Sequence, residues 1–124
     1  MVQITNTEIK DVLILEPDVY GDERGFFMET FREEWLEEEG IDARFVQDNL
    51  SFSRRRTLRG LHYQIEQPQA KLVMVTKGKV LDVAVDVRKD SPTFGQAVST
   101  LLSGQNKRQM FIPVGFAHGF AVLS

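Results

Sequence analysis

The chain has 124 residues, which is the size of one ordinary domain and too short for two. Hydrophobic residues make up 42% and charged residues 27%, which excludes a disordered chain, and the absence of cysteine excludes disulfide frameworks, zinc fingers and thiol nucleophiles. The net charge of −3 argues against a nucleic-acid partner. No apolar run approaches the ~18 residues of a membrane span, and the first residues lack the basic start of a signal peptide. We therefore expect a soluble, cytoplasmic domain with no membrane partner.

Taken in chain order, the sequence contains short strand-like runs that are separated by turn residues such as Gly and Pro. The runs cover residues 12–15, 26–31, 45–50, 61–65, 72–76, 81–87, 98–102, 109–114 and 120–123. One segment, residues 32–39, is predicted to be a helix, because Gly40 is a stop signal and Trp35 and Leu36 can form a buried side. Many short strands with almost no helix predict an all-β fold, a β-sandwich or jelly roll that spans residues 1–124.

The run at residues 81–87 shows the clearest alternation of side chains. Its two faces would carry Leu81, Val83, Val85 and Val87 on one side and Asp82, Ala84 and Asp86 on the other. The run at residues 72–76 leads into Lys77-Gly78-Lys79, which predicts a hairpin turn between these two strands. The apolar run at 120–123 needs a partner for its face and its edge, so we expect it to pair with another subunit or with further chain.

The two histidines of the chain both lie beside strand-like runs. The alternation from Arg59 to Gln64 places His62 on the same face as Gln64, as expected at the mouth or in the lumen of a barrel. His118 lies between glycines, in the loop that enters the last run. Either histidine can instead be structural and bonded to backbone, and the residues alone leave both interpretations open.

A metal site is a natural hypothesis for a jelly roll, but the ligand set here is poor. The usual His-x-His pair is missing, because Gln64 occupies the second position. His62 and His118 can still meet in space, and Glu66 follows on the same face, but two imidazoles without a dependable carboxylate bind metal weakly. We expect neither a metal nor another cofactor.

Three further features place charge where a ligand can meet it. Lys71, at the start of an apolar run, is either a solvated residue or an ammonium that stabilises an anionic oxygen. Residues 54–59 contain the only basic cluster, which is either a solvated loop or a phosphate clamp. If Phe27, Glu29 and Phe31 share a strand face, a carboxylate stands between two aromatic rings, which favours a ligand-facing surface.

These residues together resemble the dTDP-4-dehydrorhamnose 3,5-epimerase family, and the similarity runs in one order from about residue 3 to residue 124. The matching stretches are Arg24-Gly25 with Phe27, Glu29 and Phe31, then Gln47-Asp48-Asn49, Leu58 to Gln64, Lys71, Leu81 to Arg88, Ser91 to Gly95, and Ile112 to Phe120. One such motif would be weak evidence, whereas the ordered series is specific.

The resemblance implies a metal-free jelly roll of the cupin type that works as a homodimer in deoxysugar biosynthesis. The implied substrate is a nucleotide sugar, a thymidine diphosphate 4-keto-6-deoxyglucose. His62 would then be the base that removes the protons at C3 and C5, and Lys71 would stabilise the enolate oxygen. Substrate-binding roles, some of them reaching in from the neighbouring subunit, are implied for Arg24, Phe27, Glu29, Gln47, Asp48, Asn49, Arg59 and His118.

Chains of this family continue past the position of Ser124, and the resemblance implies that the further part supplies a tyrosine acid and an aspartate that orients His62. Tyr20 and Tyr63 are poor substitutes for that acid, because Tyr63 alternates away from His62 and Tyr20 precedes a turn. Three classes of function follow from the sequence. They are an active epimerase, a catalytically inactive module that binds a sugar nucleotide or carbohydrate, and a metal-dependent jelly-roll enzyme.

Overall fold

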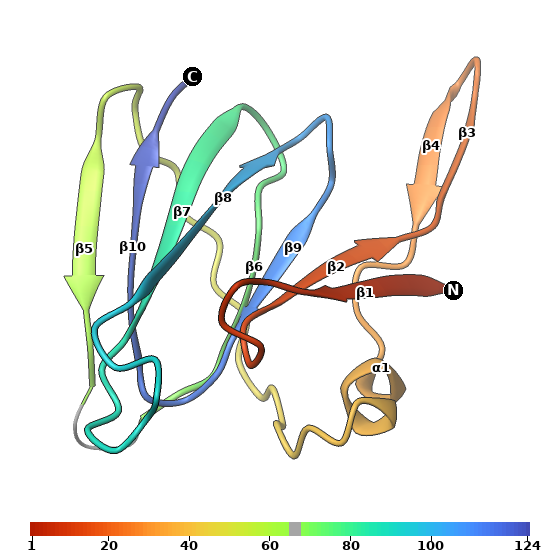
Figure 1. The fold of residues 1–124 in the computed structure, drawn as a ribbon. Helices are drawn as coiled ribbons and strands as arrows, with labels where there is room; N and C mark the ends of the chain where they lie inside the picture. Colours follow the sequence, from red (N-terminus) through yellow and green to blue (C-terminus); the bar gives the residue numbers. More distant parts are fainter. Residues whose placement is uncertain (65–67) are drawn as a thin grey trace.

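The computed structural model describes residues 1–64 and 68–124, which form ten strands and one short helix (Figure 1). The elements in chain order are β1 (Val2–Asn6), β2 (Leu13–Pro17), β3 (Val19–Asp22), β4 (Gly25–Met28), α1 (Glu33–Glu38), β5 (Leu58–His62), β6 (Lys71–Met74), β7 (Lys79–Asp86), β8 (Ala97–Ser103), β9 (Gln109–Ile112) and β10 (Phe116–Val122). The prediction of an all-β chain with one short helix is therefore confirmed.

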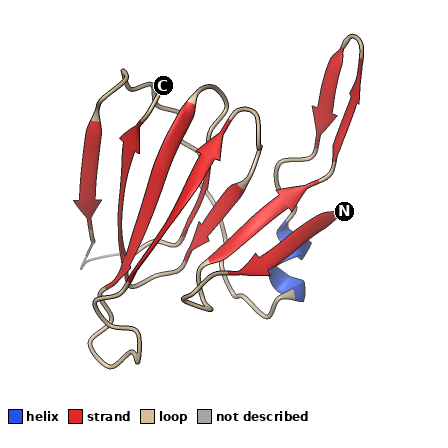
Figure 2. Cartoon of the chain, turned by 45° about the horizontal axis from the view of Figure 1, so that its top comes forward, coloured by secondary structure: helices blue, strands red, loops and turns tan. Residues whose placement is uncertain are grey.

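Two antiparallel sheets form the layers of a cupin-like β-sandwich (Figures 1 and 2). One sheet has the strand order β1-β2-β9-β6 and the other has the order β5-β10-β7-β8. Strands β3 and β4 pair with each other alone, as a hairpin that projects away from both sheets (Figure 1). The two sheets therefore face each other, and the hairpin reaches outward from the first sheet.

Two clusters of buried apolar side chains hold the layers together. The first fills the space between the sheets and contains Ile9, Val12, Ala84, Val98, Leu102, Met110, Ile112 and Phe116. The second lies under α1, where Trp35 and Leu36 pack against Phe111 and its neighbours on the outer face of the first sheet. This packing confirms the predicted helix and its buried side. It also explains how so short a helix persists, since tertiary contacts supply most of a helix's stability.

Strand β7 buries the face that carries its acidic residues. Asp82, Ala84 and Asp86 each have 0% relative exposure, whereas Leu81 on the opposite face is 37% exposed. An unpaired buried carboxylate costs several kcal/mol or more, so each aspartate on this strand needs a dedicated partner. The alternation expected from the sequence is present, and its polar face is the inner one.

Asp86 finds its partners in the loop that follows β7. Arg88 donates to both carboxylate oxygens, with Nε 3.0 Å from Oδ1 and Nη2 2.9 Å from Oδ2, and the hydroxyls of Ser91 and Thr93 donate to Oδ2. The same guanidinium reaches Asp11 at 3.1 Å, which ties the β1–β2 connection to this loop. These donors, led by Arg88, lower the pKa of the Asp86 carboxyl well below its usual value of 3.8.

Several expectations about strand positions were wrong or incomplete. Residues 45–50, all of which the structure describes, form no strand, and their apolar side chains Val46 and Leu50 are 86% and 87% exposed. The turn at Gly78 joins β6 to β7, which lie in different sheets, so it is not a hairpin. Strands β1 and β3 were not predicted, and the run expected at 61–65 ends in Ile65, which lies outside the described residues.

The last strand is longer than the predicted run at 120–123, and it pairs within the chain. Strand β10 begins at Phe116 and lies between β5 and β7 of the same sheet, with both neighbours antiparallel. The expectation that this run must find its edge partners in another subunit or in further chain was therefore wrong. Its position between two strands makes β10 the central support for the residues of the second sheet.

We expect Asp86→Asn to lower the free energy of unfolding by roughly 1.5–3 kcal/mol at neutral pH, because a charged acceptor is lost from several hydrogen bonds. The pKa of Asp86 is lowered by folding, so its contribution is fully present above pH 3.8 and disappears as the pH falls through the folded-state value. Denaturant unfolding between pH 7 and pH 2 measures this dependence.

The matched control is Asp90→Asn, which changes an exposed aspartate in the same loop. This control should keep the stability and acid sensitivity of the parent. Equal stability of Asp86→Asn and the parent at pH 7 would show that the buried carboxylate contributes nothing.

Candidate functional site

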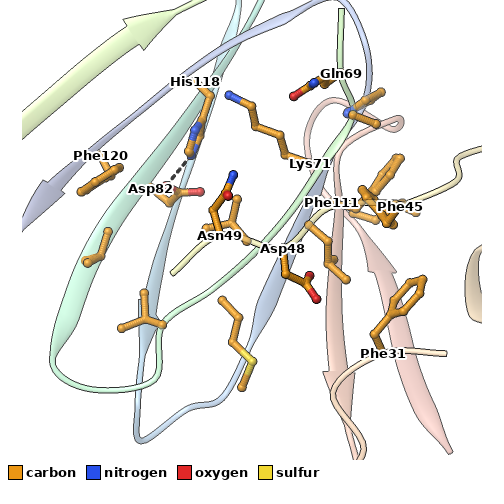
Figure 3. A pocket seen from close by; sticks show the side chains of 18 of the residues that line it. Phe31, Phe45, Asp48, Asn49, Gln69, Lys71, Asp82, Phe111, His118 and Phe120 are labelled. Atoms are coloured by element: carbon orange, nitrogen blue, oxygen red, sulfur yellow. Dashed lines mark hydrogen bonds and ion pairs between the residues drawn. The ribbon is translucent and has the colours of Figure 1, made fainter. Parts of the chain in front are cut away.

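A large cavity of about 1480 Å³ lies beside the inner face of the sandwich (Figure 3). This volume exceeds the ~300–1,000 Å³ of a typical small-molecule pocket, so there is room for an extended ligand of two or three parts. The cavity brings together five residues that were singled out from the sequence, namely Gln47, Asp48, Asn49, Lys71 and His118. They come from the 42–55 segment, β6 and β10, which are far apart in the chain.

His118 and Asp82 form the most tightly defined contact in this cavity (Figure 3). Nε2 of His118 lies 2.7 Å from Oδ1 of Asp82, and the two side chains are 13% and 0% exposed. Oδ2 of Asp82 is buried and has no hydrogen-bond partner among the described residues. A buried carboxylate in this position fixes the orientation of the imidazole ring.

The prediction from the sequence included His118 and missed Asp82 as a site residue. The sequence did contain a signal for Asp82, because this residue lies between apolar neighbours, on the face opposite to Leu81 and Val83. The sequence does not say which face of a strand turns inward. The sequence alone is therefore compatible with an Asp82 that faces solvent as well as with one that is buried.

His62 lies on β5 directly opposite His118 on β10. Side chains of directly paired residues on neighbouring strands project to the same face of a sheet. The two histidines, remote in sequence, are therefore neighbours on the inner face, as the sequence allowed. His62 itself is exposed and does not belong to the residues that line the cavity, so it stands at the rim of the site.

Two glycines allow β5 and β10 to approach closely enough for this pairing. A Cβ on Gly119 would lie 2.6 Å from the carbonyl oxygen of Arg59, and a Cβ on Gly60 would lie 2.6 Å from the Cα of Gly119. Gly60 also has a φ of +100°, in a region that other residues rarely adopt. The glycines beside the histidines in the sequence therefore set the distance between the two strands.

Lys71 begins β6 and faces the cavity from the opposite sheet, close to Asn49 and His118 (Figure 3). It pairs with Ile112 on β9, which fixes its position at the cavity end of the strand. Within residues 1–64 and 68–124, no carboxylate lies within 4.0 Å of its ammonium. The cation is therefore available to an anionic group in the cavity.

Three predicted binding residues lie on or beside the projecting hairpin and do not line the cavity. Arg24 donates to Asp22 at 2.8 Å and lowers the pKa of that carboxyl. Glu29 accepts two bonds from Arg32, at 3.1 and 2.9 Å, and this contact raises the pKa of Arg32. Phe27 is 71% exposed.

The expectation that Glu29 stands between two aromatic rings on one strand face was wrong. Strand β4 ends at Met28, so Glu29 and Phe31 lie beyond it. Phe31 instead makes edge contacts with Trp35 and Phe45, at ring distances of 6.5 and 5.6 Å. It therefore belongs to the wall of the cavity rather than to the hairpin.

Arg59 is the one arginine of the basic cluster that lies on a strand, β5. Its Nε donates to the hydroxyl of Ser53 at 3.0 Å, and Ser53 lines the cavity. Arg54 and Arg55 line the cavity from the preceding segment. Positive charge from this stretch therefore stands along one side of the cavity, where it suits a phosphate group.

The described part of the chain contains no group of three His, Asp or Glu side chains that could hold a metal ion. Glu66, the carboxylate considered from the sequence, lies outside the described residues. Nor does that part contain a helix with the length and apolar character needed to cross a membrane.

Comparison with known proteins gives consistent results. The family model described as dTDP-4-dehydrorhamnose 3,5-epimerase matches residues 6–124. The dTDP-4-dehydrorhamnose 3,5-epimerase of Methanothermobacter thermautotrophicus is 56% identical over 118 residues, which cover 95% of this chain and 64% of that protein. The enzyme of the same name from Shigella flexneri is 59% identical over 125 residues, covering 99% and 69%.

The structural comparison agrees. A crystal structure of dTDP-6-deoxy-D-glucose-3,5-epimerase from Legionella pneumophila, in complex with dTDP-4-keto-L-rhamnose, matches with a TM-score of 0.97 and 60% identity. The match covers 100% of this chain and 66% of that one. The chain thus spans about two thirds of the length of the relatives that it resembles.

We expect Gly119→Ala to lower the free energy of unfolding by roughly 1–3 kcal/mol, the usual cost of forcing extra atoms into a packed site. The added methyl would meet the Arg59 carbonyl at 2.6 Å and push β5 away from β10. Denaturant unfolding monitored by circular dichroism measures the loss.

Gly21→Ala is the control, because its Cβ would meet its nearest neighbour at an ordinary 3.6 Å and should change stability by about 0.5 kcal/mol or less. If both variants unfold like the parent, the close approach of the two strands places no demand on Gly119.

Proposed function

Because the chain belongs to the dTDP-4-dehydrorhamnose 3,5-epimerase family, we propose that it epimerises C3 and C5 of dTDP-4-dehydro-6-deoxy-D-glucose. The product would be dTDP-4-dehydro-L-rhamnose, an intermediate of deoxysugar biosynthesis, and the site of action would be the cytoplasm. The observation that supports this best is that His118, held by the buried Asp82, lines one cavity with Lys71, and that His62 is paired with His118 at the rim of this cavity. Residues 1–124 would form one jelly-roll domain that needs no metal or other cofactor.

The proposed chemistry is proton transfer at the carbons beside a ketone. The C4 carbonyl acidifies the hydrogens at C3 and C5, and His62 removes each of them as a general base. The electron pair then moves onto the C4 oxygen, where the Lys71 ammonium stabilises the enolate. A general acid on the opposite face then donates a proton to the same carbon and completes the inversion, and the resemblance to the family implies a tyrosine for this role. Tyr20 and Tyr63 are not assigned as the acid for that step.

His118 is proposed to bind the sugar beside the reacting carbons. Asp82 holds its ring through Nε2, so the other ring nitrogen, Nδ1, has a fixed orientation toward a bound ligand. Because the ring is oriented in advance, it can hydrogen-bond to a polar group of the sugar without reorganisation on binding. Gln47, Asp48 and Asn49 would hold polar groups of the substrate from the facing segment.

The two phosphates are proposed to lie along the basic side of the cavity, with Arg59 as their main ligand. A guanidinium can contact two phosphate oxygens at once, which gives direction as well as affinity. Arg59 already points toward Ser53 at the cavity wall, so a small rotation of its side chain would bring it to a bound diphosphate.

We further propose a homodimer in which the hairpin of one subunit completes the cavity of the other. Arg24, Phe27 and Glu29 match the family's binding residues but do not line the cavity of their own chain. The hairpin projects outward and exposes Phe26 and Phe27 by 61% and 71% (Figure 1). Neighbouring exposed aromatic side chains mark a surface that another molecule covers.

The experiment that tests the proposed reaction is incubation with the 4-keto sugar nucleotide in heavy water, with the parent and with His62→Asn. We expect the parent to place deuterium at C3 and C5. The asparagine keeps hydrogen bonding but cannot take up a proton, so exchange should fall by about 10²–10⁴-fold.

A folded His62→Asn that binds thymidine diphosphate normally and exchanges normally would exclude His62 as the base. A parent that binds the nucleotide sugar without any exchange would favour the inactive binding module.

Lys71→Met should slow turnover by about 10²–10³-fold, the usual effect of removing one donor that stabilises an oxyanion. Affinity for thymidine diphosphate should change little, because the anion at C4 exists only along the reaction path. Steady-state kinetics and calorimetric binding measure the two effects.

The control is Lys79→Met, at the exposed start of β7, which should leave both quantities unchanged. Weaker nucleotide binding by Lys71→Met, with unchanged turnover, would make Lys71 a binding contact only.

A further inference from the structure

Three consecutive residues that follow the β8–β9 turn contact the β3–β4 hairpin and both of its stems. The contacts pair Lys107 with Phe26 on the hairpin, Arg108 with Glu16 on the strand that enters it, and Gln109 with Thr30 on the segment that leaves it. None of the three residues lines the cavity, so the proposed chemistry gives them no role.

Lys107 holds the hairpin itself. Its ammonium lies 4.4 Å from the centre of the Phe26 ring, which is the geometry of a cation–π interaction. The same ammonium donates to the carbonyl of Gly104 at 2.7 Å, so its position above the ring is fixed from the other side. The side chain therefore links the hairpin to the body of the sandwich.

Gln109 and Arg108 hold the two stems. Gln109 is 1% exposed, and its Nε2 donates to the carbonyl of Thr30 at 2.6 Å. Thr30 immediately precedes Phe31 of the cavity wall, so this bond fixes the chain where the hairpin ends and the wall begins. Nε of Arg108 lies 3.5 Å from Oε2 of Glu16, close to the start of the hairpin.

The turn that carries these residues is itself rigidly built. Oδ1 of Asn106 accepts from the backbone nitrogens of Ser103 and Arg108 at 3.1 and 3.0 Å. The Asn106 side chain also donates to the carbonyl of Leu101 at 2.9 Å, and its backbone nitrogen donates to the Ser103 hydroxyl. Such a turn can serve as a fixed support, because its own backbone is held at several points.

We propose that residues 107–109, the hairpin clasp, are positioning residues that fix the direction in which the β3–β4 hairpin projects. This inference rests on the proposed function, in which the hairpin carries Arg24, Phe27 and Glu29 into the neighbouring subunit's cavity. A hairpin held only at its base would sweep through many orientations, and each binding event would have to select one of them. The clasp removes that cost, so it acts on affinity without touching the substrate.

The direct test is a distance measurement between the hairpin and the body. The chain has no cysteine, so spin labels attach only at introduced sites, Glu23→Cys in the hairpin turn and Gln96→Cys at the exposed position just before β8. Pulsed electron paramagnetic resonance on labelled protein diluted with unlabelled protein reads the distance within one chain. The clasp predicts a narrow distribution in the parent background and a broad one in Lys107→Met and in Gln109→Met.

Two control variants make the result specific. Lys107→Arg keeps a cation over the ring and should restore the narrow distribution. Lys89→Met removes an exposed lysine in the loop after β7, outside the clasp, and should leave the distribution unchanged. Lys107 lies on a surface turn, so its variants test the clasp even if the buried Gln109→Met folds poorly.

Calorimetry of thymidine diphosphate binding to the same variants measures whether the orientation of the hairpin affects the affinity of the site. Losing the cation–π contact should weaken binding by roughly 2- to 30-fold in Lys107→Met, with Lys107→Arg and Lys89→Met close to the parent.

A narrow distance distribution in Lys107→Met and Gln109→Met would overturn the clasp. A broad one with unchanged affinity would overturn its role in positioning. A parent that binds no nucleotide would refute the proposed function, and the distributions would still decide whether the clasp holds the hairpin.

Discussion

The burial of two carboxylates on one strand is the constraint on which the rest of the structure depends. Asp82 and Asp86 lie on the inner face of β7 with 0% exposure, and a buried charge must be paired and hydrogen-bonded to be tolerated. Asp86 is paired with the guanidinium of Arg88, and this contact holds the loop that follows β7. Asp82 is paired with an imidazole, and it thereby places a functional group in the cavity. One strand thus links stability at one end to chemistry at the other.

The position of β10 connects this strand to the remaining site residues. Pairing with β7 brings His118 to Asp82, and pairing with β5 brings His62 to His118. Gly60 and Gly119 permit the second pairing, because any larger residue would separate the strands. Lys71 comes from the other sheet, so the site exists only when the two layers pack. The binding residues proposed on the hairpin are outside this framework, so their placement would need a support of its own.

The sequence predicted those parts of the fold that depend on local pattern. The alternation at 81–87, the helix around Trp35 and Leu36, and the short strands all follow from side-chain periodicity and turn residues. It could not predict that residues 45–50 form no strand, because a short run that contains apolar residues resembles a strand whether or not a neighbouring strand is present. It could not assign Asp82 to the site, because periodicity separates two faces without saying which one is buried. His62 and His118 were chosen as candidates from their residue type and their nearby glycines, whereas their pairing across β5 and β10 depends on strand order.

The most direct test of this account is ¹⁵N nuclear magnetic resonance of the two histidine side chains in the protein at neutral pH. The account predicts that Nε2 of His118 carries a proton that is held by Asp82 and protected from exchange with water, since the carboxylate is fully buried and the imidazole is only 13% exposed. His62, at the exposed rim, should show no such protection. The Asp82→Leu variant should lose the protected signal. An unprotonated His118 Nε2, or one that exchanges as freely as that of His62, would contradict the claim that a buried carboxylate organises this site.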